Sequence, residues 1–365
     1  MSEYKMKIGI TQGDTNGVGW EVILKALSDV TITELFTPVV YGSKRAAECH
    51  AARLTDVEAV QFNICGSASD ARRGRVNLVE CGEKEVRVEF GRATVEAARQ
   101  AVAALERAVA DLQRGELDAV VTAPINKESM QEAGFGFTGH TEYFASKADG
   151  QPMMIMCSEL LRVALMTVHM PVENVASSLT KEGIEGALVA LRKTLKRDFG
   201  VVEPRIAVLS LNPHAGDGGL LGREEEELIR PAVLAAYEGG TLAFGPLAAD
   251  GLFGGGTFRK YDAILAMYHD QGLTPFKTLS PEGVNFTAGL DVVRTSPDHG
   301  TAYDIAGKGV ADAQSMRNAI YEALDIVRRR RAYDEWSRRP LERFERDKGR
   351  DVSVKDLKLP TEEND

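Results

Sequence analysis

The sequence predicts an α/β fold with two α/β/α lobes and a cleft between them. Short apolar runs typical of buried strands alternate with amphipathic helical stretches, the pattern of a parallel sheet covered by helices on both faces. With 365 residues, 44% of them hydrophobic, the chain is long enough for two such lobes. The sequence has no internal repeat and no Pro/Gly-rich linker, so we expect strands to pass between the lobes.

The first strand runs into a Gly-rich turn, GDTNGVGWE at residues 13–21, and then into a helix. Such a turn either cradles a phosphate at the helix N-terminus or makes a tight strand-to-helix connection. Because it matches neither GxGxxG nor the P-loop, both interpretations stay open. Residues 39–41 predict a strand, and residues 94–113 predict a helix that begins after Thr94 and stops at Gly115.

The later part of the chain continues the alternation. Residues 117–124 predict a strand and the loop after it, and residues 315–336 predict a helix followed by a charged tail. The run from Arg328 to Arg331 is expected to be a solvated helix end, where cations complement the helix dipole.

Three of the six histidines follow apolar runs of the same kind: LRVALMTVH ends at His169, RIAVLSLNPH at His214 and YDAILAMYH at His269. The carboxyl ends of parallel strands meet at one edge of a sheet, so these imidazoles can converge on one cleft. Three imidazoles leave a fourth position open on a metal, as catalytic sites require. The alternative is that each is a hydrogen-bonded structural residue.

Further polar residues are candidates for binding a small anion. His140 and Thr141 can donate hydrogen bonds to a carboxylate, and Thr141 alternatively caps the next helix. In a Gly-rich stretch, Lys277, Asn285 and Arg294 supply a point charge, an amide and a planar fork. This is the set of donors that a phosphate needs.

Composition excludes other classes of function. A net charge of −10 argues against nucleic acid as the main partner. The N-terminal segment has no signal-peptide pattern, and no apolar stretch is long enough to cross a bilayer, so we expect no membrane association. The cysteines form no CxxC pair, which suits reduced thiols in the cytoplasm. They are Cys49, Cys65, Cys81 and Cys157.

Taken together, these motifs resemble the 4-hydroxythreonine-4-phosphate dehydrogenase family of vitamin B6 biosynthesis. The resemblance covers nearly the whole chain, from GDTNGVGWE through VTAPINK, GHTEYFA, HMPVENV, LNPHAGDGGLLGREE and HDQGLTPFK to DHGTAYDIAGKG. It implies the fold of the isocitrate and isopropylmalate dehydrogenases. It also implies an outer lobe of residues 1–125 and 270–365 with the cofactor loop, and a second lobe of residues 126–269 with metal ligands and dimer contacts.

The resemblance assigns roles residue by residue. The implied metal ligands are His169, His214 and His269. The implied substrate contacts are His140, Thr141, Lys277, Asn285 and Arg294. The implied catalytic residues are Lys277 and two supporting aspartates, Asp250 and Asp270. The implied cofactor contacts are His299 and Asp304.

The implied reaction is the oxidation of 4-phosphooxy-L-threonine by NAD, with NADP as the alternative, followed by decarboxylation to 3-amino-2-oxopropyl phosphate. The implied metal is divalent, with zinc preferred and cobalt, nickel, magnesium or manganese as alternatives. The family is homodimeric with a site shared between chains, and we expect His169 and His214 of one subunit to meet His269 of its partner.

The chain departs from the family pattern at two places. Thr15, Asn16 and Trp20 replace residues of the usual GDPAGIGPE motif, and the segment between Lys277 and Asn285 is one residue shorter. Related dehydrogenases that act on threonate or erythronate phosphate share much the same motifs and stay an alternative. A metal-dependent hydrolase and a phosphate-binding module are further alternatives.

Overall fold

The computed structural model describes residues 5–55, 57–83 and 85–339. Within them, twelve strands form a single sheet in the order β3-β4-β2-β1-β5-β12-β11-β6-β7-β10-β8-β9. The strands are β1 Lys7–Thr11, β2 Thr37–Gly42, β3 Phe62–Cys65, β4 Val76–Glu80, β5 Ala119–Thr122, β6 Gly150–Cys157, β7 Arg162–Leu165, β8 Arg205–Leu209, β9 Leu242–Leu247, β10 Ala263–Ala266, β11 Val284–Leu290 and β12 Arg294–Pro297.

Helices connect the strands and cover both faces of the sheet. The α-helices are α1 Gly19–Leu27, α2 Ile32–Leu35, α3 Lys44–Ala51, α4 Val95–Gln113, α5 Lys127–Glu132, α6 His140–Ala145, α7 Val175–Ser178, α8 Lys181–Arg197, α9 Arg230–Glu238, α10 Ala249–Gly254, α11 His269–Leu279 and α12 Gln314–Ser337. Single-turn 3-10 segments and the π-helical turn Glu225–Ile229 complete the described chain.

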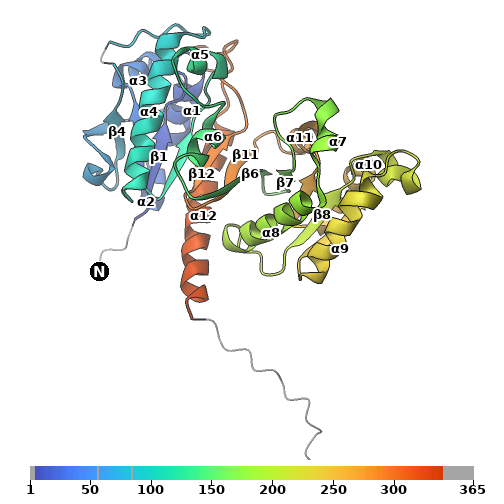
Figure 1. The fold of residues 1–365 in the computed structure, drawn as a ribbon. Coiled ribbons are helices and arrows are strands. Elements are labelled where there is room, and N and C mark those ends of the chain that lie inside the picture. Colours follow the sequence, from blue (N-terminus) through green and yellow to red (C-terminus); the bar gives the residue numbers. More distant parts are fainter. Residues whose placement is uncertain (1–4, 56, 84, 340–365) are drawn as a thin grey trace, which may run out of the picture.

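The sheet consists of two parallel halves joined by antiparallel strands. In the first half, the neighbouring strands pair in parallel in the order β3, β4, β2, β1, β5 and β12. In the second half, β7, β10, β8 and β9 also pair in parallel. Between the halves, β11 is antiparallel to β12 and β6, and β6 is antiparallel to β7. Figure 1 shows the two groups of elements on either side of these joining strands. The predicted α/β class with two lobes is confirmed.

The hydrophobic core is continuous on one face of the sheet and interrupted on the other. A single cluster joins apolar residues of α1, α8, α9 and α12 to both half-sheets. On the opposite face one cluster lies under α4 and α6, and a separate cluster lies under α10 and α11. The joining strands therefore carry an open region on this second face.

Several predicted elements are confirmed. Strand β2 covers residues 39–41, and α4 begins after Thr94, whose side chain accepts a hydrogen bond from the Ala97 N–H. The expectation of a fully solvated arginine run in α12 is wrong, because Arg330 is buried in an ion pair with Asp198 of 2.7 Å. This pair attaches α12 to the end of α8.

The lobe boundaries stay a prediction. Helix α11, which starts at the second boundary, contacts β7 and β10 of the second half-sheet. Residues 1–4 and 340–365, which the prediction included in the outer lobe, lie outside the described residues. In the part of the chain that the structure describes, no helix has the length and apolar character needed to cross a membrane.

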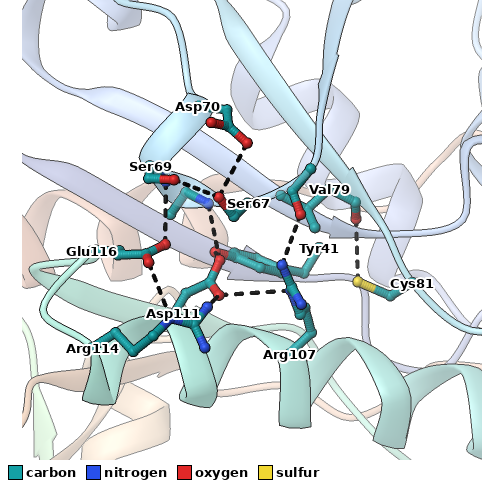
Figure 2. Close-up of polar contacts among 12 residues, drawn as sticks. Tyr41, Ser67, Ser69, Asp70, Val79, Cys81, Arg107, Asp111, Arg114 and Glu116 are labelled. Carbon is teal, nitrogen blue, oxygen red and sulfur yellow. Dashed lines mark hydrogen bonds and ion pairs between the residues drawn. The ribbon is translucent and has the colours of Figure 1, made fainter.

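A buried polar network stabilises the first half-sheet (Figure 2). The hydroxyl of Tyr41 donates to Asp111 Oδ2 over 2.6 Å, and the Ala68 N–H donates to the same oxygen over 2.9 Å. Tyr41 and Asp111 are fully buried, and Arg107 from α4 and Arg114 directly after it balance the carboxylate. The network connects β2, α4 and the turn after β3, away from the joining strands.

We therefore expect Tyr41→Phe to lower the free energy of unfolding by about 1–2 kcal/mol, because one buried hydrogen bond to a charged acceptor is lost. Urea unfolding at neutral pH measures the change. Neither substrate nor cofactor affinity should move. Unchanged stability, or a change confined to ligand affinity, would contradict this structural role.

Candidate active site

The joining strands place polar side chains in the open region between the two separate core clusters, because successive residues of a strand face opposite sides of the sheet. On β11, Phe286 belongs to the continuous core, so its neighbours Asn285 and Thr287 face the opposite side. The residues paired with them on β12 are Ser296 and Arg294, respectively. The floor of the open region is therefore polar because alternate residues of these strands must cover the core behind it.

A cleft of about 300 Å³ lies at this position. All five predicted substrate contacts line it: His140, Thr141, Lys277, Asn285 and Arg294. The cleft also contains residues that the sequence analysis did not single out: Thr122, Lys127, Glu142 and Asp298. Thr122 and Lys127 belong to the motif VTAPINK. This motif lies at the end of a predicted strand, where ligand-binding residues of α/β sheets collect, so the sequence contained a signal for them.

Arg294 is a buried cation whose hydrogen-bond partners are all neutral. Its Nε and Nη2 donate to Thr122 Oγ1 over 3.0 and 2.6 Å, and its Nη1 donates to Thr287 Oγ1 over 3.1 Å. Burial lowers the Arg294 pKa to about 9, although nearby Glu142 acts in the opposite direction. The guanidinium stays charged at neutral pH. A buried cation of this kind favours an anionic ligand.

The contact with Arg294 fixes the protonation of His140. Arg294 Nη2 lies 3.2 Å from His140 Nδ1, and because guanidinium nitrogens only donate, Nδ1 is the acceptor. Burial, together with the charges of Arg294 and Lys127, holds the His140 pKa well below its usual value of 6.5. His140 is therefore neutral at pH 7 and carries its proton on Nε2, where it can donate to a ligand.

Two further groups equip the cleft for polar recognition. Lys277 Nζ forms an ion pair with Asp298 Oδ1 over 3.1 Å. Burial raises the Asp298 pKa, and Lys277 opposes that shift. The buried Oδ1 of Asn285 has no hydrogen-bond partner among the described residues. A ligand that supplies a donor at this oxygen satisfies it.

His169 and His269 lie together beside the cleft. Their ring centroids are 6.1 Å apart, because β7 and β10, which precede them, are neighbouring parallel strands. His269 Nδ1 is 2.7 Å from Asp270 Oδ1. A proton on Nδ1 donated to Asp270 leaves the Nε2 lone pair free for a metal. Burial lowers the His169 pKa, with Lys127 acting in the same direction.

His214 lies apart from this pair. It lines a separate cavity of about 550 Å³ together with Asp250 and Tyr268, and Tyr268 also lines the cavity that contains His169 and His269. Among the described residues no three His, Cys, Asp or Glu side chains are grouped closely enough to hold a metal. His169 and His214 line different cavities of one chain, and their expected pairing within one subunit stays a prediction.

The predicted cofactor loop borders a second pocket of about 290 Å³. His299 lines both this pocket and the cleft, and its buried Nε2 has no partner among the described residues. Ala302 and Ile305 give the pocket an apolar wall. Asp304 is exposed and is not among its lining residues.

The Gly-rich turn at residues 13–21 packs directly against the predicted cofactor loop. A Cβ on Gly17 would lie 2.7 Å from the carbonyl oxygen of Thr301, and Asp14 accepts a hydrogen bond of 2.7 Å from the Tyr303 hydroxyl. Two of the three residues that depart from the family motif are anchored as well. Asn16 accepts from the Glu89 N–H, and the Trp20 indole donates to Gln12. These contacts favour the tight-turn interpretation.

Comparisons with known proteins found relatives that are similar in sequence and in fold. The family model described as pyridoxal phosphate biosynthetic protein PdxA matches residues 34–323. A curated 4-hydroxythreonine-4-phosphate dehydrogenase of Bacteroides thetaiotaomicron is 52% identical and covers 100% of both chains. The crystal structure of an enzyme of that name from Klebsiella pneumoniae has a TM-score of 0.78 at 33% identity, covering 90% of this chain and 99% of that one.

The neutral state of half-buried His140 has a consequence for stability. Between its lowered folded pKa and pH 6.5, the unfolded chain binds the extra proton, so the stability present above pH 6.5 declines as pH falls through this window. We expect His140→Gln to reduce the loss of unfolding free energy between about pH 7.5 and about pH 5. His214→Gln, at an exposed histidine, is the control. Parallel pH profiles for all three proteins would refute the prediction.

Proposed function

Since the chain belongs to the family of pyridoxal phosphate biosynthetic protein PdxA, we propose that it oxidises 4-hydroxythreonine 4-phosphate with NAD and a divalent metal. Decarboxylation of the oxidised substrate gives 3-amino-2-oxopropyl phosphate for pyridoxine 5′-phosphate biosynthesis. The observation that carries this proposal is the order of the sites: the cleft shares His299 with the pocket at the cofactor loop and His169 with the histidine pair.

The cationic end of the cleft suits the substrate phosphate. Arg294 supplies a guanidinium whose charge is not neutralised within the cleft floor, and Lys277 supplies a second positive charge. Neutral His140 contributes its Nε2–H to the phosphate, while the Oδ1 of Asn285 accepts from a donor group of the substrate. These contacts bind a group remote from the reacting carbon and thereby orient the substrate.

His169 and His269 fit a divalent metal because they are adjacent imidazoles with Asp270 at the far nitrogen of one of them. When bound, such a metal lowers the pKa of a substrate hydroxyl and stabilises the negative charge that develops during decarboxylation. Asp270 orients His269, and Asp298 holds Lys277 in the cleft. Asp250 lines the cavity of His214.

A second copy of the chain supplies the third ligand in our proposal. His214 is exposed on its loop, and the apolar side chains of Leu220 and Leu221 beside it are exposed too. Met170 and Val172, next to His169, are likewise exposed. Exposed apolar surface therefore lies beside His214 and also beside His169. Such surfaces suit a twofold interface in which His214 of each subunit completes the metal site of the other.

The pocket beside the cofactor loop supports NAD over NADP. Glu282 and Asp312 line it, and none of its lining residues, all within the described chain, is Lys or Arg. A 2′-phosphate would therefore meet carboxylates without a compensating cation. The apolar side chains of Val18, Val22 and Ile305 suit the flat face of a base.

One experiment separates this proposal from the alternatives. The protein is incubated with NAD, Zn²⁺ or Co²⁺, and either 4-hydroxythreonine 4-phosphate or the phosphates of threonate and erythronate, and NADH absorbance is followed. Turnover of the amino acid supports the proposal. Turnover of only a sugar-acid phosphate would show that the proposed substrate is wrong. Release of phosphate without formation of NADH would indicate a hydrolase.

We expect Arg294→Lys to raise the KM for the phosphorylated substrate by roughly tenfold or more, because a point charge replaces the guanidinium fork. The KM for NAD should stay unchanged. Arg330→Lys, at a buried arginine paired with Asp198 outside the cleft, controls for general effects of replacing a buried arginine. Initial rates distinguish the two constants. A rise in the NAD constant alone would move Arg294 to the cofactor site.

The shared site predicts a specific pattern of complementation. His169→Ala and His214→Ala should each be inactive, but a mixed dimer has one site with both defects and one intact site. Random reassortment of equal amounts should therefore recover about a quarter of wild-type activity. The matched control combines His169→Ala with His269→Ala, which damages both sites and should recover nothing. The reverse pattern would restore the original grouping of the histidines.

A further inference from the structure

The segment that carries His214 holds a backbone conformation that L-residues rarely adopt. Within Pro213–Gly219 the φ angles of His214, Ala215 and Asp217 are 54°, 53° and 44°. Together with the intervening glycines, they form one left-handed turn. Each non-glycine residue in this region is strained, so contacts around the turn must hold it in place.

Glu225, on the π-helical turn that follows the loop, makes these contacts. Its Oε1 accepts hydrogen bonds of 2.8 Å from the backbone N–H groups of Leu211 and Asn212. Its Oε2 accepts a bond of 2.9 Å from Asn212 Nδ2. The side chain is completely buried, so these three donors replace its hydration.

The same carboxylate also limits the loop on the other side of His214. A Cβ on Gly216 would lie 2.7 Å from Glu225 Oε2, so the backbone at Gly216 passes close against the carboxylate. Glu225 therefore contacts the chain two residues before and two residues after His214. The backbone on both sides of His214 is therefore close to one buried carboxylate.

We propose that Glu225 is the positioning residue that holds His214 ready to bind the metal of a second subunit. This inference rests on the proposed role of His214 as a ligand. Without Glu225 the strained turn relaxes, and the imidazole must be reordered when the metal binds. Groups that orient a metal ligand in this way typically change metal affinity by about 10–100-fold when they are removed.

A purely structural role for Glu225 must be separated from this one. Acidic residues in the first turn of a helix stabilise it through the helix dipole, and Glu226 lies in the same first turn but is exposed. Glu226→Gln is therefore the matched control for charge removal. Asn212→Ala is a second test, because it removes the side-chain donor that Glu225 shares with Glu224 and leaves both carboxylates in place.

The experiment titrates the full-length, metal-free protein with Co²⁺ alone and follows the visible absorption of the bound ion, with thermal melting measured in parallel. We expect Glu225→Gln and Asn212→Ala to weaken Co²⁺ binding roughly tenfold or more, while Glu226→Gln binds like wild type. At saturating metal, kcat of Glu225→Gln should return close to the wild-type value, since His214 is still present.

The variant His214→Ala tests the metal site separately from the positioning role of Glu225. If His214→Ala binds Co²⁺ like wild type, the proposed metal site itself is wrong. If His214→Ala loses Co²⁺ but Glu225→Gln and Asn212→Ala bind it as tightly as Glu226→Gln, the metal site stands and the role of Glu225 is overturned. If Glu225→Gln does not fold, Asn212→Ala alone decides between these outcomes.

Discussion

The arrangement of the site depends on a buried cation, Arg294, at the junction of the two half-sheets. Its guanidinium is held by the hydroxyls of Thr122 and Thr287 and by a neutral His140. Burying this charge without a carboxylate partner is costly, and the cost is offset when an anion enters the cleft. Burial lowers the pKa of His140, and the charge of Arg294 acts in the same direction. Arg294 thus favours an anionic ligand and helps to keep its neighbour a neutral donor.

Much of this site follows from residue patterns in the sequence. The apolar runs before His169, His214 and His269 predicted strands whose ends meet at one sheet edge, and the structure has β7, β8 and β10 as neighbouring parallel strands. Lys277, Asn285 and Arg294 come from α11, β11 and β12, yet their donor chemistry predicted one anion site, and they line one cleft. Strand periodicity explains why Asn285 and Arg294 lie on the same face of the sheet.

Other features depend on contacts that a sequence pattern does not contain. The run PHAGDGG indicates a turn, but its left-handed backbone is bordered by contacts of Glu225, eleven residues after His214. Arg330 belongs to a run of arginines typical of a solvated helix end, and Asp198 from a distant helix buries it. Asp298 is recognisable as part of the cleft only through Lys277. In each case the partner is remote in sequence.

The central claim is that His169 and His269 of one subunit and His214 of another hold the metal beside the cleft. The most direct measurement is an anomalous diffraction map of crystals grown with Co²⁺. We predict a peak about 2.0–2.1 Å from an imidazole nitrogen of each of the three residues, with His214 contributed by the second copy. A peak bound only by residues of one chain, or remote from His169 and His269, would contradict the account.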